Sequence, residues 1–358
     1  MSSIKMKEKA FELLQSYYSA LKQDIDKNGY TAEFLGLDEP GFQKTRLLCQ
    51  SRSLFFMLCY FELSGDDQAL IYADKLYTLI NTKFHDDTTG NWKKYPDDDR
   101  LDDLYEYAFL LFSFSKYYRQ RSNTSVLNNI KQLHQIMIDE VLKDFSCKNL
   151  TQSDGRISQN ALMHLFEAYL EAYKATSEDD FKHVLERLLE TIADLFYCKN
   201  IDLIAEYAPI NSEDCGENIY EPGHSFEWCC LLYEAENFGI ELAKLKAFDA
   251  IAKAAETHGV IDNKVVAPAI GGGQTHTPQS LQFRIWPVLE RLRYYAMSEN
   301  QATLKPAFES FCQLFIDKNQ LPIEYIDHRL APGFNKIKST TSYHLINALQ
   351  YVIRGVDG

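Results

Sequence analysis

Two segments of the chain place a histidine three residues before a glutamate, His164-Leu-Phe-Glu167 and His224-Ser-Phe-Glu227. Both segments have the apolar spacing of helices, and residues three apart lie on one helix face, so each imidazole can project beside its carboxylate. A carboxylate fixes the tautomer of a neighbouring imidazole and raises its basicity, which suits proton transfer and metal binding equally. For either motif alone, a buried polar pair at a helix interface is the alternative.

The surroundings of these motifs favour proton transfer. The Pro-Gly pair at 222–223 places His224 at the start of its helix, where the first turn is exposed at an edge and the helix dipole favours an anion nearby. Asn160 lies four residues before His164 and adds an amide to that face. A third histidine, His344, lies one turn into the last predicted helix, after a Ser/Thr run suited to capping. Its alternative is an ordinary polar residue on a terminal helix.

Two further residues have side chains suited to a ligand site. Arg52 lies in the apolar stretch RLLCQSRSLFFMLCYFE, where its guanidinium must find a partner or a wet cavity, because an unpaired buried charge is strongly unfavourable. A structural salt bridge is the alternative. Trp286 lies in RIWPVLERLRYY at 284–295, where an indole can stack on a sugar or a buried Arg–Glu bridge can explain the segment. The aromatic stripe at 104–118, LYEYAFLLFSFSKYY, is typical of a core.

Several other kinds of site are not indicated. The sequence contains no HExxH, GxSxG or GxGxxG motif and no catalytic cysteine signature. Gly271-Gly272-Gly273 is not followed by Lys-Ser or Lys-Thr and follows no strand pattern, so we expect no phosphate-binding loop there.

The composition narrows the class of protein. A formal net charge of −14 disfavours nucleic acid and anionic membranes as partners. The N-terminal segment alternates charged and apolar residues, which predicts neither a signal peptide nor a membrane span. The cysteines lack a CxxC pair and lie mostly in apolar periodic segments, so we expect reduced core cysteines and a cytoplasmic protein. They are Cys49, Cys59, Cys147, Cys198, Cys215, Cys229, Cys230 and Cys312.

Apolar residues recur every three to four positions along nearly the whole chain, which predicts an all-α protein. The predicted helices cover residues 4–28, 40–64, 66–84, 101–121, 124–146, 158–175, 178–197, 224–238, 241–258, 278–296, 301–318 and 340–353. About twelve helices suggest six helical hairpins, and no linker is long or low in complexity, so residues 1–358 are expected to form a single domain. The best candidate for a small β-hairpin is 259–270, with a turn at Asp262-Asn263.

Six segments occur in the order found in one enzyme family. They are QSRSLFFM at 50–57, DLYEYAFLL at 103–111, NALMHLFEAYLEAY at 160–173, EPGHSFEWCCLL at 221–232, RIWPVLERL at 284–292 and SYHLINAL at 342–349. With these segments the chain resembles the N-acylglucosamine 2-epimerase family, which also holds mannose isomerases and cellobiose 2-epimerases. The segments together span most of the chain, and the PGHxFEW and N-x-x-MHLxEA patterns are the most specific.

The resemblance implies an (α/α)6 barrel, in agreement with the helix count, with a sugar cleft at one end. It implies proton transfer without metal or cofactor by two histidines, His224 and His344, on the carbon next to a ring-opened aldehyde. Glu227 would support His224. The residues that hold or polarise the oxygens of the sugar would be Arg52, Tyr105, Asn160 and His164, and Trp286 would be an aromatic in the cleft.

The first hypothesis is an aldose–ketose isomerase that interconverts mannose and fructose, or a close analogue, through a cis-enediolate. A proton returned to C1 gives the ketose, whereas a proton returned to C2 from the opposite face gives the epimer. A 2-epimerase of N-acylglucosamine or of a cellobiose-like sugar is therefore the alternative. The R-x-WP-x-x-E segment at 284–290 is similar to the mannose isomerase type, and His344-Leu-Ile-Asn347 lacks the arginine that is common after the last histidine in the epimerase branches.

Three other classes stay open at this point. A metal enzyme would use the two H-x-x-E motifs, although their order is the reverse of the Glu-x-x-His order in di-metal helical bundles. An (α/α)6 glycoside hydrolase would need paired carboxylates, and a helical ring can also serve as a non-enzymatic scaffold. The preferred interpretation is an enzyme, monomeric or homodimeric, that acts on a small monosaccharide.

Overall fold

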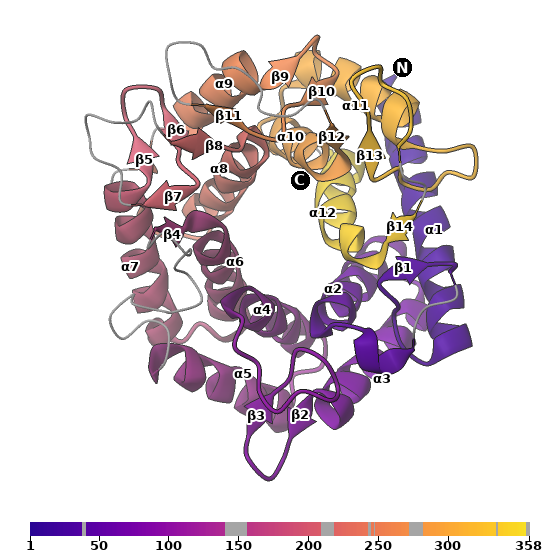
Figure 1. Ribbon diagram of the computed structural model, residues 1–358, viewed down its shortest axis with the longest axis vertical. Helices are drawn as coiled ribbons and strands as arrows, with labels where there is room; N and C mark the ends of the chain where they lie inside the picture. Colours follow the sequence, from indigo (N-terminus) through magenta and orange to yellow (C-terminus); the bar gives the residue numbers. More distant parts are fainter. Residues whose placement is uncertain are drawn as a thin grey trace. The chain divides into compact units, whose positions relative to one another are not determined.

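The computed structural model describes residues 1–37, 41–139, 156–208, 218–242, 245–246, 248–271, 282–333 and 336–355. Within these residues the protein is mainly helical, with short strands between the helices (Figure 1). The described helices are α1 (Ser3–Asn28), α2 (Leu47–Ser64), α3 (Asp67–Lys83), α4 (Leu104–Gln120), α5 (Thr124–Met137), α6 (Gln159–Thr176), α7 (Asp179–Leu195), α8 (Pro222–Asn237), α9 (Phe248–Gly259), α10 (Ile285–Met297), α11 (Gln301–Phe315) and α12 (Ser342–Arg354). The all-α prediction is confirmed.

Four helices begin three or more residues later than predicted, because the described residues before them adopt other conformations. Before α2, Gly41 has a φ of 102° and residues 42–44 form a separate 3-10 helix. Before α4, Asp103 is extended and its side chain accepts a hydrogen bond from the Tyr105 N–H as an N-cap. Helices α9 and α10 also begin several residues late. Parts of the predicted helices lie outside the described residues, namely 40, 140–146, 243, 244, 247 and 278–281.

The predicted β-hairpin near 259–270 is confirmed. Strands β9 (Val260–Ile261) and β10 (Val265–Val266) pair antiparallel. Asp262 and Asn263 at the turn have positive φ values of 52° and 57°, as a type I′ turn requires and as Asn and Asp tolerate.

Other two-residue strands escape sequence analysis, because an alternating pattern cannot be seen over two positions. Within the described residues β2 pairs with β3, β5 with β6, β8 with β11, and β12 with β13, all antiparallel. The bounds are β1 (Phe34–Leu35), β2 (His85–Asp86), β3 (Asn91–Trp92), β4 (Ile157–Ser158), β5 (Tyr197–Cys198), β6 (Leu203–Ile204), β7 (Tyr207–Ala208), β8 (Ile219–Tyr220), β11 (Ile270–Gly271), β12 (Phe283–Arg284), β13 (Tyr325–Ile326) and β14 (Ile337–Lys338).

The chain divides into two compact units. Unit 1 comprises Met1–Tyr17, Glu186–Ile337 and His344–Gly358, and unit 2 comprises Tyr18–Leu185 and Lys338–Tyr343. The expected single domain over residues 1–358 stays a prediction.

In unit 2, helix α2 packs against α3 and α4, and α4 packs against α5 and α6 (Figure 1). Every residue of α2 from Leu47 to Tyr60 is buried, including the polar Gln50, Ser51 and Arg52. A helix that is buried all round belongs to the interior rather than to an amphipathic surface layer. Arg52 is therefore a buried cation in a core helix.

In unit 1, helix α8 packs against α9 and α10, and α10 packs against α11. Every residue of α8 from Pro222 to Leu232 is buried, and so is every residue of α10. These two core helices carry His224 and Trp286 at their first turns, so an apolar helix body fixes the position of each polar or aromatic side chain at its start.

The expected reduced state of the cysteines is confirmed for those that are free, which are Cys49, Cys59, Cys229, Cys230 and Cys312. It is wrong for Cys198, which is disulfide-bonded, because spacing along a sequence does not show which side chains meet in space. Cys147 and Cys215 lie outside the described residues. Disulfides are unusual in the cytosol, and the cytoplasmic location stays a prediction.

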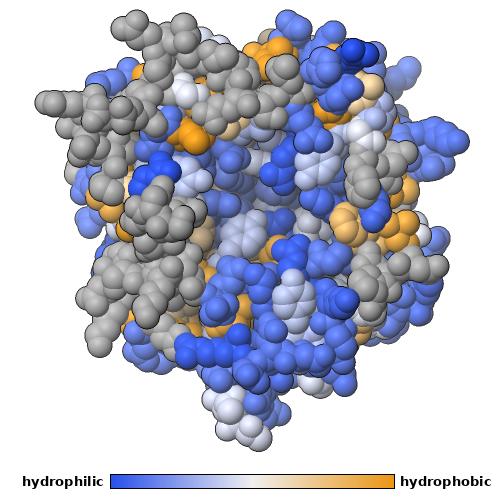
Figure 2. Space-filling view, in the orientation of Figure 1, coloured by the Kyte–Doolittle hydropathy of each residue, from blue (hydrophilic) through white to orange (hydrophobic). Residues whose placement is uncertain are grey.

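Two observations bear on the surface. No helix in the described part of the chain combines the length and the apolar character that crossing a bilayer requires. Hydrophilic side chains predominate on the described part of the face shown in Figure 2. This agrees with the net charge of −14.

Candidate active site

His224 lies in the first turn of α8. Glu221, the N-cap residue, is extended with φ −96° and ψ 110°, and Pro222 follows at the first helical position, where its missing N–H is harmless. The His224 Nδ1 atom lies 3.0 Å from Oε1 of Glu206 and 3.7 Å from Oε2 of Glu221. The imidazole is therefore held by carboxylates that precede it in the chain.

The imidazole of His224 hydrogen-bonds Glu206. The predicted support of His224 by Glu227 stays a prediction, although the charge of Glu227 does help to raise the pKa of His224. Side chains on a helix point back toward its N-terminus. This direction brings His224 close to Glu221, three residues before it. No sequence pattern marked Glu206, which comes from the short segment between β6 and β7, because its proximity to α8 depends on the fold.

The carboxylates control the charge of His224. Burial disfavours the imidazolium, but the negative charges of Glu206 and Glu221, with a smaller contribution from Glu227, outweigh burial and raise the pKa of His224 to about 10. Burial also raises the pKa of Glu221, although His224 beside it acts in the opposite direction. This group of side chains shares a proton that resides on His224 at neutral pH, so His224 can act as a proton donor.

Trp286 lies next to both predicted catalytic histidines, His224 and His344. Its ring centroid is 4.8 Å from that of His224 and 5.4 Å from that of His344. Gly223 makes this approach possible, because a Cβ atom there would lie only 2.7 Å from two atoms of the indole and 2.8 Å from Cβ of Pro287. That Trp286 lines a sugar cleft stays a prediction. Its indole does lie next to the imidazoles of both His224 and His344.

His344 has a carboxylate partner of its own. Its Nδ1 atom lies 2.6 Å from Oε1 of Glu290, which is fully buried in α10. Arg293 donates to Oε2 of the same glutamate over 3.3 Å and to Oε1 of Glu234 over 2.8 Å. Tyr351 also donates to Glu234. The buried Arg–Glu bridge considered for the segment RIWPVLERLRYY is therefore formed, between Arg293 and Glu290. The same Glu290 is the partner of His344.

Glu290 is a weak counter-charge for its histidine. Burial is the largest influence and raises the pKa of Glu290 to about 7, while Arg293 opposes that rise. Glu290 is thus partly protonated near neutral pH, and its remaining charge is shared with Arg293. Glu227 lies near His344, since its carboxylate is within 4.8 Å of the donor atoms of Glu290 and His344.

A second cluster lies in unit 2 around Arg52. The guanidinium donates to the carbonyl oxygen of Thr340 over 3.0 Å and to the Tyr105 hydroxyl over 2.6 Å. It also lies over the ring of Phe109, 4.0 Å from the centroid, and 4.9 Å from that of Tyr343. Within the described residues Arg52 forms no ion pair, so the structural salt bridge considered from the sequence is not formed there.

His164 lies beside this cation. Its ring meets that of Tyr105 edge-on at 4.9 Å, and its Nδ1 atom is 3.3 Å from Oε2 of Glu167. The predicted pairing of His164 with Glu167 is therefore confirmed as a contact. The Tyr343 hydroxyl, which no pattern marked, lies 2.6 Å from both oxygens of Glu167. The Asn160 Oδ1 atom is buried without a hydrogen-bond partner among the described residues.

Two sets of donor atoms in unit 1 are close enough together to suggest a metal site. Within each set the atoms lie within 4.8 Å of one another; the sets are Glu206, Glu221 and His224, and Glu227, Glu290 and His344. In each set, however, a glutamate already hydrogen-bonds the Nδ1 atom of the histidine. In the second set the cationic Arg293 contacts Glu290 and opposes a divalent cation. Both sets suit proton transfer better than metal binding.

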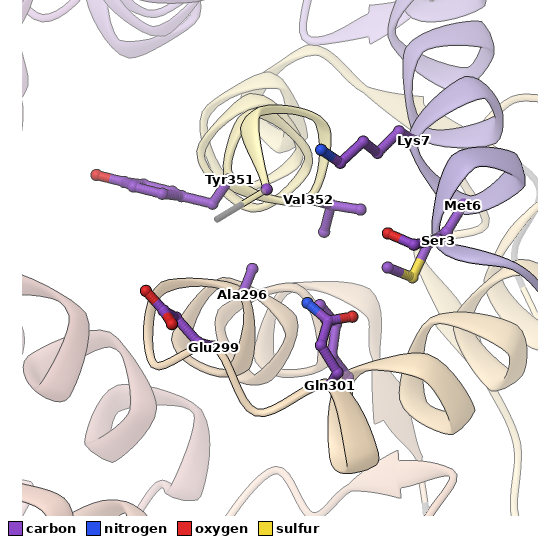
Figure 3. A pocket seen from close by; sticks show the side chains of 10 residues that line it. Ser3, Met6, Lys7, Ala296, Glu299, Gln301, Tyr351 and Val352 are labelled. Carbon is purple, nitrogen blue, oxygen red and sulfur yellow. The ribbon is translucent and has the colours of Figure 1, made fainter. Parts of the chain in front are cut away.

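Unit 1 also contains a cavity of about 300 Å³ between α1, α10, the start of α11 and α12 (Figure 3). Lys7 extends toward it from α1, with Glu299 and Gln301 on the opposite side. None of the predicted site residues is among the described residues that line it. The cavity is therefore distinct from the two histidines.

Solved structures with the same fold are (α/α)6-barrel enzymes. A cellobiose 2-epimerase from Bacillus thermoamylovorans matches with a TM-score of 0.80 at 16% identity, over 96% of this chain and 99% of that one. A D-mannose isomerase matches with a TM-score of 0.78 at 17% identity, over 98% of this chain and 97% of that one. The predicted (α/α)6 fold is confirmed.

The chain belongs to the N-acylglucosamine 2-epimerase (GlcNAc 2-epimerase) family, whose model matches residues 38–320. Among curated proteins, a cellobiose 2-epimerase from Dictyoglomus turgidum is 26% identical over 221 residues, which are 54% of this chain and 56% of that protein. One from Ruminococcus albus is 22% identical over 239 residues, 61% of each chain. The chain thus spans between half and two thirds of the length of the curated relatives it matches. The family resemblance predicted from the sequence is confirmed.

Proposed function

We propose that this protein is a sugar 2-epimerase that moves a proton on and off C2 of a ring-opened aldose by means of His224 and His344. One observation carries the proposal. Each imidazole is bound through Nδ1 to a buried glutamate, and the rings of both lie next to the same indole, that of Trp286. Inversion at C2 needs a base and an acid on opposite faces of the carbon, and two histidines can fill these roles.

In this mechanism the hydrogen on C2 is acidified by the adjacent aldehyde. One imidazole takes the proton as the C2–H bond breaks, and its electron pair moves toward the carbonyl oxygen to give a cis-enediolate. The other histidine, in its protonated form, then delivers a proton to the opposite face of C2 and the aldehyde re-forms. Histidine suits both steps, because its pKa can be tuned across neutrality by the carboxylate beside it.

We further propose, in line with the family resemblance, that the Arg52 cluster of unit 2 is suited to bind oxygen atoms of a sugar. Arg52 carries a buried positive charge that is surrounded by aromatic rings and neutral acceptors. A fixed cation of this kind stabilises negative charge on an oxygen more strongly than water does. Tyr105, His164 and Asn160 add hydrogen-bonding groups for hydroxyl oxygens, in line with the roles expected from the family.

The comparisons favour the epimerase over the isomerase that the sequence placed first. The matched family model and the curated relatives all carry the name of 2-epimerases, and the relatives are cellobiose 2-epimerases. A cellobiose-like sugar is therefore our first choice of substrate. The aldose–ketose isomerase remains the second candidate, because a D-mannose isomerase shares the fold and the same enediolate gives a ketose if the proton returns to C1.

The test is incubation with cellobiose, glucose, mannose, fructose and N-acetylglucosamine in deuterium oxide, followed by NMR of the products. A C2 epimer that carries deuterium at C2 supports the epimerase. Deuterium at C1 of a ketose supports the isomerase. If none of the sugars is converted and none exchanges a carbon-bound proton, the proposed function is wrong.

A further inference from the structure

We propose that Glu206 is the positioning residue of the proposed reaction: it orients His224 and holds it as the proton donor of the resting enzyme. This inference rests on the proposed function for its catalytic consequence, but the state of His224 itself can be measured without any substrate. Neither the H-x-x-E motif nor the family resemblance pointed to Glu206.

The backbone fixes the Glu206 carboxylate. Glu206 lies in the segment between β6 and β7, and its N–H donates to the carbonyl of Ile219, at the start of β8, over 2.9 Å. Its Oε1 atom also accepts the N–H of Glu221, the N-cap residue of α8, over 3.3 Å. The side chain is almost completely buried. One carboxylate oxygen thus connects the strand segment, the start of α8 and the imidazole of His224.

This arrangement selects the reactive nitrogen of His224. Because Nδ1 is engaged by Glu206 at 3.0 Å, the nitrogen left for proton exchange with a substrate is Nε2. The indole of Trp286 lies against the ring and restricts its rotation. A carboxylate in this position fixes the tautomer and orientation of an imidazole, as the buried aspartate does in the catalytic triad of serine proteases.

Other charges surround His224 but do not replace Glu206. Glu221 lies farther from Nδ1, at 3.7 Å, is partly exposed and is also influenced by Arg284. The charge of Glu227 makes a smaller contribution to the pKa of His224 than that of Glu206, and Glu290 is engaged by His344 and Arg293. Glu206 is the strongest of the groups that raise the pKa of His224, which supports the assignment made from the geometry.

Two substitutions separate charge from position. Glu206→Gln keeps an oxygen acceptor near Nδ1 but removes the charge, and Glu206→Ala removes both. We expect Glu206→Gln to lower kcat by about 10- to 100-fold with little change in KM, and Glu206→Ala to lower it further. Activity that needs protonated His224 is lost as pH rises through its pKa. The alkaline limb of the kcat profile should therefore lie near pH 10 in the parent and move toward about pH 6.5 in Glu206→Gln.

The matched control is Glu256→Gln. Glu256 is a partly buried carboxylate of the same unit that binds Arg291 and Tyr295 and touches neither histidine. We expect it to change stability without moving the alkaline limb. If Glu206→Gln and Glu256→Gln have the same pH profile as the parent, Glu206 has only a structural role and the inference is wrong.

A substrate-free measurement keeps this outcome separate from the proposed function. With histidines labelled with ¹³C, NMR titration should show the resonance of one imidazole, absent in His224→Gln, shifting its titration to lower pH in Glu206→Gln. If that resonance titrates at the same pH in both proteins, the inference fails whatever the sugar assays show. If it shifts but no sugar is converted or exchanged, the proposed function fails while the role of Glu206 in holding the proton on His224 stands.

Discussion

The two predicted catalytic histidines, His224 and His344, have the same kind of partner but different electrostatic surroundings. His224 is bound to Glu206 and lies close to Glu221, and both carboxylates act to keep it protonated. His344 is bound to Glu290, whose charge is reduced by burial and shared with Arg293. The two histidines differ in the charged group that accompanies the glutamate: Glu221 near His224, and Arg293 on the partner of His344. We infer that His224 begins as the proton donor, because the carboxylates around it raise its pKa to about 10.

This difference has a chemical use. An epimerase needs one protonated and one unprotonated group at the same pH, and two identical side chains can supply both only if their environments differ. Here the surroundings of His224 add the carboxylate of Glu221 to that of Glu206. Those of His344 add the guanidinium of Arg293 beside Glu290, together with the carboxylate of Glu227.

The largest effect is expected from removal of either histidine. We expect His224→Ala and His344→Ala each to lower epimerisation by about 10⁴-fold without unfolding the protein. If the two histidines serve opposite faces of C2, each variant should still exchange the C2 proton of one epimer in deuterium oxide, and a different epimer in each case. Exchange of the same epimer by both variants, or near-parent rates in both, would contradict the two-histidine mechanism.

Arg293→Met should be the most destabilising change at the His344 side. It leaves Glu290 buried beside Glu234 without its cation, and breaking a buried ion pair in this way costs about 3–5 kcal/mol. The free energy of unfolding in urea measures the loss. Arg291→Met is the matched control, because its partner Glu256 is partly exposed, and a smaller loss is expected. Equal losses for the two variants would show that Arg293 does not compensate Glu290 specifically.

Gly223→Ala tests the packing between His224 and Trp286. The added Cβ would lie 2.7 Å from the indole, so we expect a loss of about 1–3 kcal/mol in stability and a lower kcat as the ring moves. Gly271→Ala is the control, since no atom of the other described residues, its two chain neighbours aside, lies within 4 Å of the Cβ it would add. Parent-like stability and activity in Gly223→Ala would mean that the contact with Trp286 is not needed.

A smaller effect is expected on the pH dependence of stability. The pKa of His224 is about 10 in the folded protein and about 6.5 in an unfolded chain, so the folded state binds more protons between these values. Stability from this group is fully present below about pH 6.5 and is lost as pH rises through 10. Urea unfolding at pH 7, 8.5 and 10 should therefore show a decline that is shallower in His224→Gln. An equal slope in both proteins would exclude the high pKa.

The smallest effect is expected from chelation. The glutamates near His224 and His344 are engaged with the imidazoles, and the proposed proton transfers need no metal. Exhaustive treatment with EDTA should leave kcat unchanged in the parent. Loss of activity that a divalent cation restores would instead assign the two donor sets to a metal.

Much of the fold could be predicted from the sequence. The apolar period of 3.6 residues located every described helix, because burial of one helix face is recorded locally in the chain. The turn at Asp262-Asn263 was also predictable from local sequence, since those residues tolerate the left-handed backbone that the turn needs. The start of α2 was not predictable, because residues 42–44 before it form a separate 3-10 helix and nothing in their polarity separates them from the helix.

The site was predictable in part. His224, Trp286 and His344 were marked by their segments and meet in unit 1, and His164 and Glu167 are in contact as their spacing indicates. Glu206 and Tyr343 were missed, because the contacts of Glu206 with His224 and of Tyr343 with Glu167 join residues far apart in sequence.

By itself, then, the sequence determined the helices, the family and the residue types that can carry a proton, all of which depend on local pattern and order along the chain. Only the tertiary structure decided which carboxylate hydrogen-bonds the Nδ1 atom of each histidine. That choice sets the charge of His224, because electrostatic interactions depend on distance in space and on burial, and neither is encoded in the spacing of a motif.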